Sequence, residues 1–291
     1  MSATTRRVLI TGGAGQLAQA AGPAFAAEGW DVTALDIAEM DIRDRDLVFA
    51  TARELRPDVI LNLAAIRDAD QCEVDVENAW ATNDAAVHTL ADACVDIGAH
   101  LTTISSDYVF SGDHDVPYVE SDEAGPLSVY GASKLASETV VDQGFTVVRT
   151  AWLAGRLGAN TIKTILRLAA NPDQQLAFVN DQKGSPTVAE DLAPVLVRLS
   201  AERLPGVFHV TNQGEATWHE LACYAMASAG YDPARMKGIA TDELDPPRAA
   251  RRPAYSVLEN AALRREGIAL LPDWRDAVRD LVRDIMDGRG N

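Results

Sequence analysis

The stretch Val8-Leu9-Ile10-Thr11-Gly12-Gly13-Ala14-Gly15-Gln16-Leu17-Ala18 decides the fold of this chain. Its aliphatic, partly β-branched start predicts a short buried strand, and the alanine-rich residues after it, up to about Glu28, predict a helix. The glycines match G-x-G-x-x-A from Gly13 and G-x-x-G-x-x-A from Gly12. Glycines between a strand and a helix permit a tight turn and bring the backbone N–H groups of the helix close to a pyrophosphate. The stretch therefore predicts a nucleotide site.

The strand signal recurs along the first half of the chain. Short apolar runs stand at residues 32–35, 59–61, 101–104 and 146–148, and helical spacing lies between them, at residues 44–55 and 76–97 among others. Strands of this kind are buried on both faces, and their alternation with helices is typical of parallel sheets with right-handed crossovers. We expect an α/β fold in which residues 1–150 form a doubly wound, Rossmann-like parallel sheet that binds NAD(P).

The pattern changes after Trp152. Helix-like segments dominate residues 151–291, at 161–170, 188–201, 218–229 and from about residue 274, with one clear strand at 207–210. The polar, proline-bearing segment 242–253 predicts a long loop, and loops of that length are usually functional or mobile. We expect this half to form a smaller, mixed α/β substrate lobe over the carboxyl edge of the sheet, interleaved with the last elements of that sheet.

Composition excludes several classes of function. The 26 basic and 43 acidic residues give a net charge of −17, which opposes binding to a nucleic-acid backbone. Apolar runs never approach the roughly 18 residues of a membrane span, and Met1–Arg7 is polar, unlike a signal peptide. Cys72, Cys94 and Cys223 are odd in number and lack a second Cys or His at metal-ligand spacing. We expect a cytoplasmic enzyme with no nucleic-acid or membrane partner and no metal.

Asp36 ends the second predicted strand about 20 residues after the glycines, where a carboxylate accepts hydrogen bonds from a ribose 2′-OH and repels a 2′-phosphate. Asp41 and Ile42 are placed to flank an adenine, the carboxylate taking the exocyclic amine and the isoleucine packing on the ring. Arg43 and Arg45 follow closely after this pair, and their positive charges would allow a 2′-phosphate to bind there. Both NADH and NADPH therefore stay open as cofactors, with a mild lean to NADH.

Tyr130 and Lys134 are four residues apart, so on a helix they share one face. A free tyrosine has a pKa of about 10, and a nearby ammonium lowers it, which makes the phenol a usable proton donor. Tyr-x-x-x-Lys alone is common and more often marks a surface pair. Here Ser105-Ser106 also follows the fourth strand, at the sheet edge where doubly wound folds bind ligands.

This order of glycine loop, serine and Tyr/Lys pair resembles the extended short-chain dehydrogenase/reductase superfamily. Within it, the chain resembles the dTDP-4-dehydrorhamnose reductase family over nearly its whole length. The Asp-Gln-x-Gly-x-Pro-Thr run in the second half is the most family-specific match. The matching segments are residues 105–112, 130–134, 149–152 and 180–187, Arg252-Pro253 with Ser256 and Leu258, and residues 271–274.

The resemblance implies an oxidoreductase of deoxysugar biosynthesis. It would reduce, with NAD(P)H, the C4 ketone of a nucleotide-linked 6-deoxy-4-keto sugar, dTDP-4-dehydrorhamnose or a close relative. Ser106, Tyr130 and Lys134 would be catalytic, although the family usually has threonine in place of Ser106. Asp107 and Trp152 would contact the sugar, with Ser106. The implied cofactor contacts are Gly15, Gln16, Leu17, Asp36, Asp41, Ile42, Ala65, Ile66 and Arg67, beside Gly12, Tyr130 and Lys134.

Three departures qualify the resemblance. Ala18 replaces the last glycine of the loop, which is a tolerated change. Ile66-Arg67 stands where the family usually has an aromatic residue or histidine followed by threonine, so we expect Arg67 to reach the cofactor or the substrate diphosphate. Ala20 stands where some relatives place an acidic residue of a metal-bridged dimer, so no metal is carried over, and a homodimer stays open.

Three alternative functions stay open. A sugar 4,6-dehydratase of the superfamily would have Thr-Asp-Glu after the fourth strand, but Tyr108 stands at the third position and lacks the carboxylate. An epimerase or another reductase of nucleotide sugars would use the same fold, and an epimerase would consume no NAD(P)H. A non-catalytic regulatory subunit is the third alternative, and the intact Ser/Tyr/Lys trio argues against it.

Several conspicuous residues are expected to serve structure alone. Trp218 and Trp274 are predicted to pack the second lobe. His209 lies in an apolar strand and is predicted to be a hydrogen-bonded core histidine. The acidic runs 113–115 and 120–123 are predicted to be solvated loop.

Overall fold

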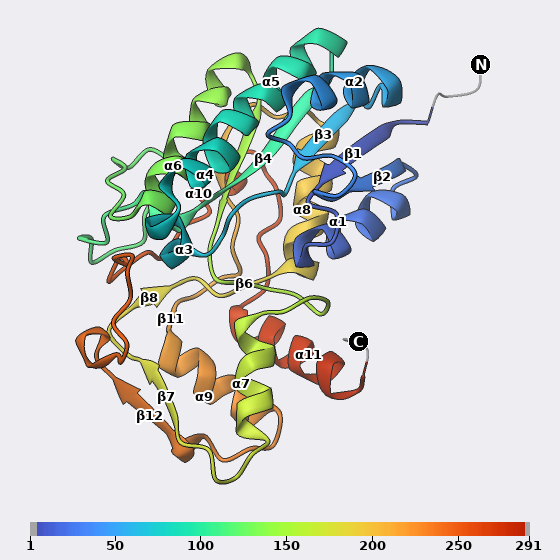
Figure 1. The fold of residues 1–291 in the computed structure, drawn as a ribbon. Helices are drawn as coiled ribbons and strands as arrows, with labels where there is room; N and C mark the ends of the chain where they lie inside the picture. The colour runs from blue at the N-terminus through green and yellow to red at the C-terminus, as the bar shows by residue number, and fades with distance from the viewer. Residues whose placement is uncertain (1–4, 289–291) are drawn as a thin grey trace.

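The computed structural model describes residues 5–288. Its centre is a six-stranded sheet of strand order β10-β5-β4-β3-β1-β2, and every neighbouring pair runs parallel. This confirms the predicted doubly wound α/β fold (Figure 1). The strands are β1 (Arg7–Thr11), β2 (Asp31–Leu35), β3 (Val59–Asn62), β4 (His100–Ser106), β5 (Thr146–Thr150) and β10 (Gly206–His209).

Helices cover both faces of the sheet, as the alternation of side chains in β1 requires. Val8 and Ile10 point into a core shared with α1 (Gln16–Ala27) and α8 (Ala189–Ala201). Leu9 points the other way, into a core shared with α2 (Arg45–Leu55) and α5 (Ala86–Ile97). Because successive side chains of a strand face opposite sides, an all-apolar run such as Val8–Ile10 is stable only between two helical layers.

The helix predicted over residues 76–97 is interrupted. It consists of α4 (Val76–Trp80), a π-helical turn η1 (Ala81–Ala85), and α5, with α3 (Ala69–Val74) before them. A single-turn π bulge inside a helix often marks a functional position. Beside α4 and η1 runs α6 (Val129–Ser137), which carries Tyr130 and Lys134 (Figure 1).

The second half forms a layer of helices and very short strands below the sheet (Figure 1), around an apolar core of its own. The predicted helices are present as α7 (Thr161–Ala169), α9 (Trp218–Ser228) and α11 (Trp274–Met286), besides α8 on the sheet and the short α10 (Ala261–Arg265). The division of the chain at residue 150 stays a prediction.

Six short strands of this layer were not predicted, because segments of two to four residues carry too little periodicity to be recognised. They pair as β6 (Leu153–Ala154) with β9 (Thr187–Val188), β7 (Leu176–Val179) with β12 (Met236–Ile239), and β8 (Lys183–Gly184) with β11 (Ala216–Thr217).

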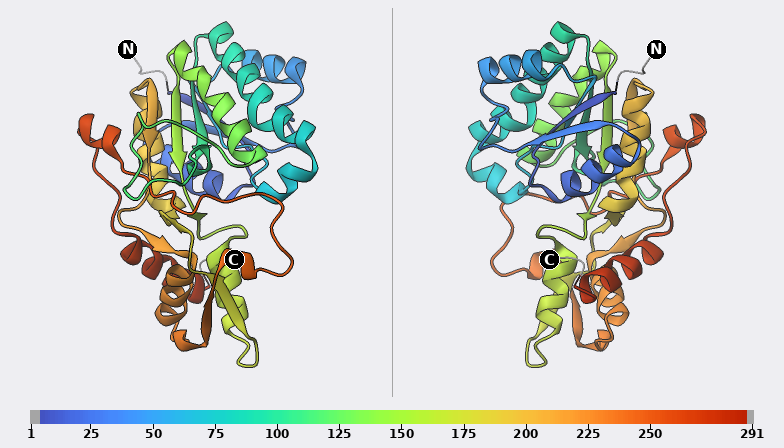
Figure 2. Two further views of the ribbon diagram at one scale, coloured as in Figure 1. Left: turned by 90° about the vertical axis from the view of Figure 1, so that its left-hand side faces the viewer. Right: turned by 90° about the vertical axis from the view of Figure 1, so that its right-hand side faces the viewer.

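The segment predicted as a long loop, residues 242–253, is one, apart from the end of the 3₁₀ turn η5 (Thr241–Glu243). It leaves the lower layer and returns to the base of the sheet (Figure 2). There Arg252 donates to both carboxylate oxygens of Asp70, at 2.6 and 2.7 Å, and the backbone N–H of Ala250 donates to the same carboxylate. The remaining 3₁₀ turns are η2 (Asp107–Val109), η3 (Glu138–Gln143) and η4 (Pro233–Arg235).

A buried ion pair lies between η3 and the sheet. Arg149 in β5 donates to Glu138 from Nε (2.9 Å) and Nη2 (2.6 Å), and both side chains are almost fully buried. Nη1 of Arg149 lies 3.3 Å from Nε2 of His209, whose Nδ1 contacts the Tyr118 and Glu259 carbonyls. Burial and Arg149 lower the pKa of His209 to about 3, so the prediction of a core histidine is confirmed.

Within residues 5–288, the longest apolar helices fall short of what a bilayer crossing needs. The expectation that the chain lacks a signal peptide rests on Met1–Arg7, of which residues 1–4 lie outside the described part of the chain.

The buried pair generates a stability prediction. Glu138→Ala leaves the Arg149 guanidinium buried without its carboxylate, which typically costs about 3–5 kcal/mol of unfolding free energy. The matched control is Glu202→Ala, because the pair of Glu202 with Arg198 is about half exposed and such pairs contribute roughly 0–1 kcal/mol. Urea unfolding followed by circular dichroism measures both values. Equal losses in the two variants would contradict the structural role given to Glu138.

Candidate active site

A cleft of about 1210 Å³ lies along the carboxyl edge of the sheet, between the sheet and the second layer. The glycine loop and the ends of β2, β3, β4 and β5 form its upper wall, and residues from β6, β7 and the 242–253 loop form the lower wall. Every site residue predicted from the sequence lines it: Gly12, Gly15, Gln16, Leu17, Asp36, Asp41, Ile42, Ala65, Ile66, Arg67, Ser106, Asp107, Tyr130, Lys134 and Trp152.

The glycine loop has the shape that a dinucleotide requires. Gly12 has φ +65°, and a Cβ there would lie 2.9 Å from the backbone nitrogen of Ala64, so only glycine fits. Gly15 is the N-cap of α1, and no side chain caps this helix or places a carboxylate in its first turn. The first-turn N–H groups of α1 therefore suit a pyrophosphate. Asp36 faces the same loop, because its Oδ2 accepts a hydrogen bond from the Ala14 N–H at 2.7 Å.

The end of the cleft lined by Asp41 and Ile42 carries an ion pair. Arg43 donates from Nε to Oδ1 of Asp41 (2.9 Å) and from Nη2 to Oδ2 (2.6 Å), and its Nη1 donates to Asn78 at 2.7 Å. The hydrogen bonds from Arg43 lower the pKa of Asp41. Arg45 does not line the cleft and pairs with Asp92 instead. From the sequence, Arg43 and Arg45 were equivalent candidates to accommodate a 2′-phosphate. In the structure Arg43 lines the cleft and is paired with Asp41, whereas Arg45 lies outside the cleft.

The predicted catalytic side chains converge from two elements. Ser106 is the last residue of β4, and Tyr130 and Lys134 lie on α6, whose first turn is capped by Ser128 through the Gly131 N–H (3.2 Å). A Cβ at Gly131 would lie 2.1 Å from the Tyr108 carbonyl oxygen. The glycine inside the Tyr-Gly-Ala-Ser-Lys run therefore allows α6 to approach the end of β4.

Burial controls the electrostatics of this group. Desolvation raises the pKa of Tyr130 to about 12, opposed by a hydrogen bond with Ser106 and, more weakly, by the charge of Arg67. Desolvation also lowers the pKa of Lys134 to about 8. The expectation that Lys134 lowers the pKa of Tyr130 is therefore wrong for the protein alone. The ammonium is itself disfavoured by burial, and the influences that favour phenolate come from Ser106 and Arg67.

Asp107 lies directly beside the catalytic serine. Its side chain is 2% exposed, and desolvation raises the pKa of the carboxyl to about 6 in spite of hydrogen bonds from two serines. Ser106 donates to Oδ1 at 3.0 Å, and Ser256 donates to Oδ2 at 2.6 Å. A carboxyl group that titrates near neutral pH next to a candidate catalytic hydroxyl is typical of active sites.

Trp152 lines the cleft together with Trp218. Trp152 has φ +46°, and its indole lies so close to Gly184 that a Cβ there would be 2.4 Å from the ring. The Trp152 and Trp218 rings stack with centroids 3.8 Å apart and planes 10° apart. The prediction that Trp218 only packs the second lobe is therefore incomplete, because Trp218 also lines the cleft. Trp274 is buried in the second core, as predicted.

Sequence reasoning missed Asn83, which lies fully buried in the π turn η1. Its Oδ1 accepts from the Ile66 N–H (2.9 Å), and its Nδ2 donates to the Ile66 carbonyl (3.0 Å) and to Ser133 on α6 (3.3 Å). Asn83 therefore holds the Ala65–Arg67 segment against the helix of Tyr130 and Lys134. An asparagine inside an otherwise apolar helical pattern is the signal that would have found it.

Two further features of the cleft were missed. The Thr150 hydroxyl at the end of β5 is buried without a hydrogen-bond partner among the described residues and lines the cleft, so it is available to a ligand. Arg248 and Arg252 bring two cations to the opposite wall, where both pair with Asp70. These arginines lower the pKa of Asp70 far below its usual range.

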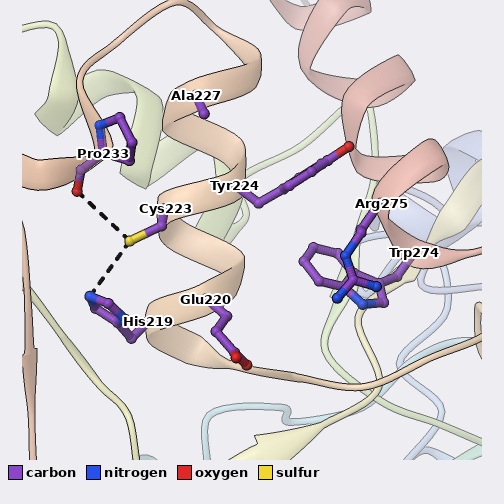
Figure 3. A pocket seen from close by; sticks show the side chains of 8 residues that line it. All are labelled: His219, Glu220, Cys223, Tyr224, Ala227, Pro233, Trp274 and Arg275. Carbon is purple, nitrogen blue, oxygen red and sulfur yellow. Dashed lines mark hydrogen bonds between the residues drawn. The ribbon is translucent and has the colours of Figure 1, made fainter.

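A second, smaller pocket of about 370 Å³ lies between α9 and the start of α11 (Figure 3). Cys223 is one of its lining residues, and its Sγ is directed toward Nε2 of His219 (3.5 Å) and the Pro233 carbonyl (3.8 Å) (Figure 3). Burial and the charge of Glu220 raise the pKa of the Cys223 thiol, which disfavours the nucleophilic thiolate. Across residues 5–288, no three His, Cys, Asp or Glu side chains are grouped to hold a metal ion.

Comparisons with known proteins show which family the chain resembles over nearly its whole length. The model of the RmlD substrate binding domain matches residues 6–286. The chain is 39% identical over 284 residues to dTDP-4-dehydrorhamnose reductase of Streptomyces griseus, covering 94% of this chain and 92% of that protein. It is 35% identical over 281 residues to the spore coat polysaccharide biosynthesis protein SpsK of Bacillus subtilis (strain 168), covering 96% and 97%.

A solved structure is similar over the same length. The crystal structure of dTDP-4-dehydrorhamnose reductase from Bacillus anthracis in complex with NADP superposes with a TM-score of 0.92 at 33% identity. The match covers 97% of this chain and 100% of that one.

The desolvation of Lys134 generates a prediction on stability and pH. Between pH 8 and 10.5 the unfolded chain binds more protons at Lys134 than the folded chain, so this group makes the unfolding free energy rise with pH in that window. Lys134→Met should therefore stabilise the protein at pH 7, by up to about 3 kcal/mol, while removing the ammonium from the site. The gain should shrink as the pH rises from 8 to 10.5. Urea unfolding at several pH values measures it, and a pH-independent difference would contradict the buried ammonium.

Proposed function

The chain belongs to the family of the RmlD substrate binding domain, and on that premise we propose that it reduces the C4 ketone of a nucleotide-linked 6-deoxy-4-keto sugar, dTDP-4-dehydrorhamnose or a close relative. The protein is a nicotinamide-dependent oxidoreductase. The observation that carries the proposal is that Ser106, Tyr130 and Lys134 share one cleft with the glycine loop and Asp36. The phenol and the hydroxyl that a carbonyl reduction needs thus line the same cleft as a dinucleotide site.

The residues present fit a dinucleotide. The uncapped start of α1 at Gly15 suits the pyrophosphate, Asp36 suits a ribose hydroxyl pair, and Lys134 suits the second ribose. Ala65, Ile66 and Arg67, held by Asn83, line the cleft between the glycine loop and the catalytic group. A bound reduced nicotinamide supplies the hydride that a ketone carbon accepts.

The proton is handled by residues of this chain. Tyr130 gives its phenolic proton to the oxygen on C4, and Ser106 donates a hydrogen bond to that oxygen while negative charge develops on it. The raised pKa keeps Tyr130 protonated at neutral pH, which is the form that a reduction requires. The hydrogen bond with Ser106 and the positive charge of Arg67 then favour the phenolate that remains.

The sugar is proposed to lie against Trp152 and Asp107. The Trp152–Trp218 stack offers a flat apolar face for a deoxysugar ring, and Asp107 offers a carboxylate at the catalytic end. A dehydratase would need a carboxylate at the position of Tyr108, whose phenol is buried and held in its neutral form by a raised pKa. The reductase is therefore the function that these residues favour.

Three finer points extend the proposal. NADH is preferred mildly over NADPH, because Asp36 faces the ribose end of the cleft while Arg43 is paired with Asp41 and Arg45 with Asp92. A cytoplasmic location fits the three unpaired cysteines, Cys72, Cys94 and Cys223. A homodimer stays a prediction, which the mass of the protein in solution tests.

The direct test is whether the purified protein oxidises NADH or NADPH when it is given a dTDP-linked 4-keto-6-deoxy sugar. We expect absorbance at 340 nm to fall in step with formation of the reduced sugar nucleotide. Absence of consumption with every 4-keto sugar nucleotide tried would refute the reductase.

Asp36 provides the test of cofactor preference. Asp36→Ala should remove the repulsion of a 2′-phosphate and one acceptor for the ribose, so the ratio of kcat/KM for NADPH to that for NADH should rise about tenfold. Asp31→Ala, at the opposite end of the same strand, is the control and should leave the ratio unchanged. An unchanged ratio in Asp36→Ala would show that this carboxylate does not contact the ribose.

Tyr130→Phe tests the proton donor. It removes only the hydroxyl, so kcat should fall roughly 10²–10⁴-fold while the KM for the sugar changes little. Tyr231→Phe, in the second core, is the matched control and should retain full activity. Steady-state kinetics with saturating cofactor measures both variants. A Tyr130→Phe enzyme that kept most of its kcat would show that another group delivers the proton.

A further inference from the structure

Ser256 is a buried serine of the second half of the chain that reaches the catalytic edge of the sheet. It is 2% exposed and does not line the cleft, so it lies behind Asp107 rather than next to a substrate. Its Oγ donates to Oδ2 of Asp107 at 2.6 Å, and the other oxygen of that carboxylate accepts from Ser106 at 3.0 Å. Asp107 is therefore held between one serine of the catalytic trio and one outside it.

The backbone around Ser256 is fixed by a segment of the second half. The Ser256 N–H donates to the Lys183 carbonyl (2.8 Å), and the Lys183 N–H donates to the Ala254 carbonyl (2.8 Å). Two residues later, the Leu258 N–H donates to Oγ of Ser185 (3.1 Å). The segments 180–187 and 252–258 thus brace each other, and their junction presents the Ser256 hydroxyl to Asp107.

The protons of this group can be counted. Ser106 has one hydroxyl proton, which it donates in a hydrogen bond to Asp107, while its oxygen accepts from the Tyr108 N–H at 3.2 Å and is also a hydrogen-bond partner of the Tyr130 phenol. A substrate carbonyl oxygen needs that same proton, so the carboxylate and the substrate compete for it. A second hydrogen bond to the carboxylate partly neutralises its negative charge. The hydrogen bond between the carboxylate and Ser106 is then weaker. Ser256 is that second donor.

We propose that Ser256 is a positioning residue for the reduction, and that its hydrogen bond to Asp107 frees the Ser106 proton for the substrate oxygen. The inference rests on the proposed function, because it assigns Ser106 to the carbonyl oxygen. Ser256 acts through Asp107 and touches neither cofactor nor sugar.

Few titratable groups surround Asp107, and their pKa values decide whether its titration can be followed separately. The titratable groups that act on it directly are Tyr108 on η2 and Tyr130 on α6. Arg252 of the 252–258 segment lies against Tyr108, and Arg67 acts on Tyr130. Both phenols stay neutral around pH 6, because burial raises the pKa of each. The carboxyl of Asp107 then titrates with a pKa of about 6, apart from the neighbouring ammonium of Lys134, whose pKa is about 8.

The first measurement needs no substrate. The protein is labelled with ¹³Cγ aspartate, and the Asp107 signal is identified as the one lost in Asp107→Asn. Ser256→Ala removes a donor to the charged form, so the titration midpoint of Asp107 should rise by about one pH unit or more. Ser256→Thr, which keeps the hydroxyl, should restore the midpoint. Ser200→Ala, which removes another buried serine paired with Thr102 far from the cleft, should not move it.

The second measurement is the pH profile of kcat/KM. In the wild type the rate should fall as pH rises through the Asp107 midpoint. The ionised carboxylate then holds the Ser106 hydroxyl in a hydrogen bond and makes it less available to the substrate oxygen. In Ser256→Ala the fall should begin at higher pH and end about tenfold lower, with the Kd for the cofactor unchanged. A merely structural role would lower the rate equally at every pH.

The outcomes are separable. An unmoved Asp107 midpoint in Ser256→Ala overturns the inference, and so does a moved midpoint with an unchanged pH profile in an active enzyme. An inactive wild type overturns the proposed function, while the midpoint still decides whether Ser256 holds Asp107. If Ser256→Ala does not fold, Ser256→Cys keeps the volume with a weaker donor and must move the midpoint in the same direction.

Discussion

Removal of water from the carboxyl edge of the sheet is the constraint on which the rest of the structure depends. Lys134 on α6 and Asp107 on η2 are buried, and Tyr130 on α6 is half-buried beside them; desolvation disfavours the charged form of each. Burying polar and ionisable groups costs folding free energy unless they are hydrogen-bonded, and the neighbouring elements supply contacts that offset this cost. Gly131 lets the helix approach, Asn83 satisfies the loop beside it, and two serines hold the carboxylate. The proposed catalytic residues are therefore destabilising by themselves and are kept in place by the packing and hydrogen bonds around them.

The sequence predicted those parts of the fold and site that repeat a local physical pattern. Apolar runs identified all six strands of the main sheet, and the glycines after β1 predicted a loop at residues 12–17 that does line the cleft, since both depend on residues close in sequence. What depends on contacts between distant residues was missed. The bond from Arg43 to Asn78, the stack of Trp218 on Trp152 and the bond from Ser256 to Asp107 each need the folded chain. The raised pKa of Tyr130 was missed for the same reason, because desolvation is a property of the whole environment.

The second half of the chain covers the cleft and also forms hydrogen bonds that hold parts of the first half in place around it. Gln16, at the start of α1, donates to the Leu153 carbonyl (3.1 Å) and accepts from the Gly155 N–H (3.1 Å), so the glycine loop is tied to the strand that follows Trp152. Asp70 ties the 242–253 loop to α3, and Ser256 ties the 252–258 segment to η2, directly after β4. These three ties meet the cleft at its cofactor end, its outer wall and its catalytic end. The shape of the cleft thus belongs to both halves.

The return of α8 and β10 to the sheet affects how the chain emerges during synthesis. Residues 7–150 supply five strands, but the face of β1 that carries Val8 and Ile10 is covered partly by α8, which starts at Ala189. At translation rates of about 5–20 residues per second, roughly 40 further residues take a few seconds to appear. During that interval an apolar face of the sheet is incompletely covered. Residues 7–150 therefore emerge without part of the apolar cover that their sheet has in the complete fold, and the nascent chain exposes apolar surface of the kind that chaperones bind.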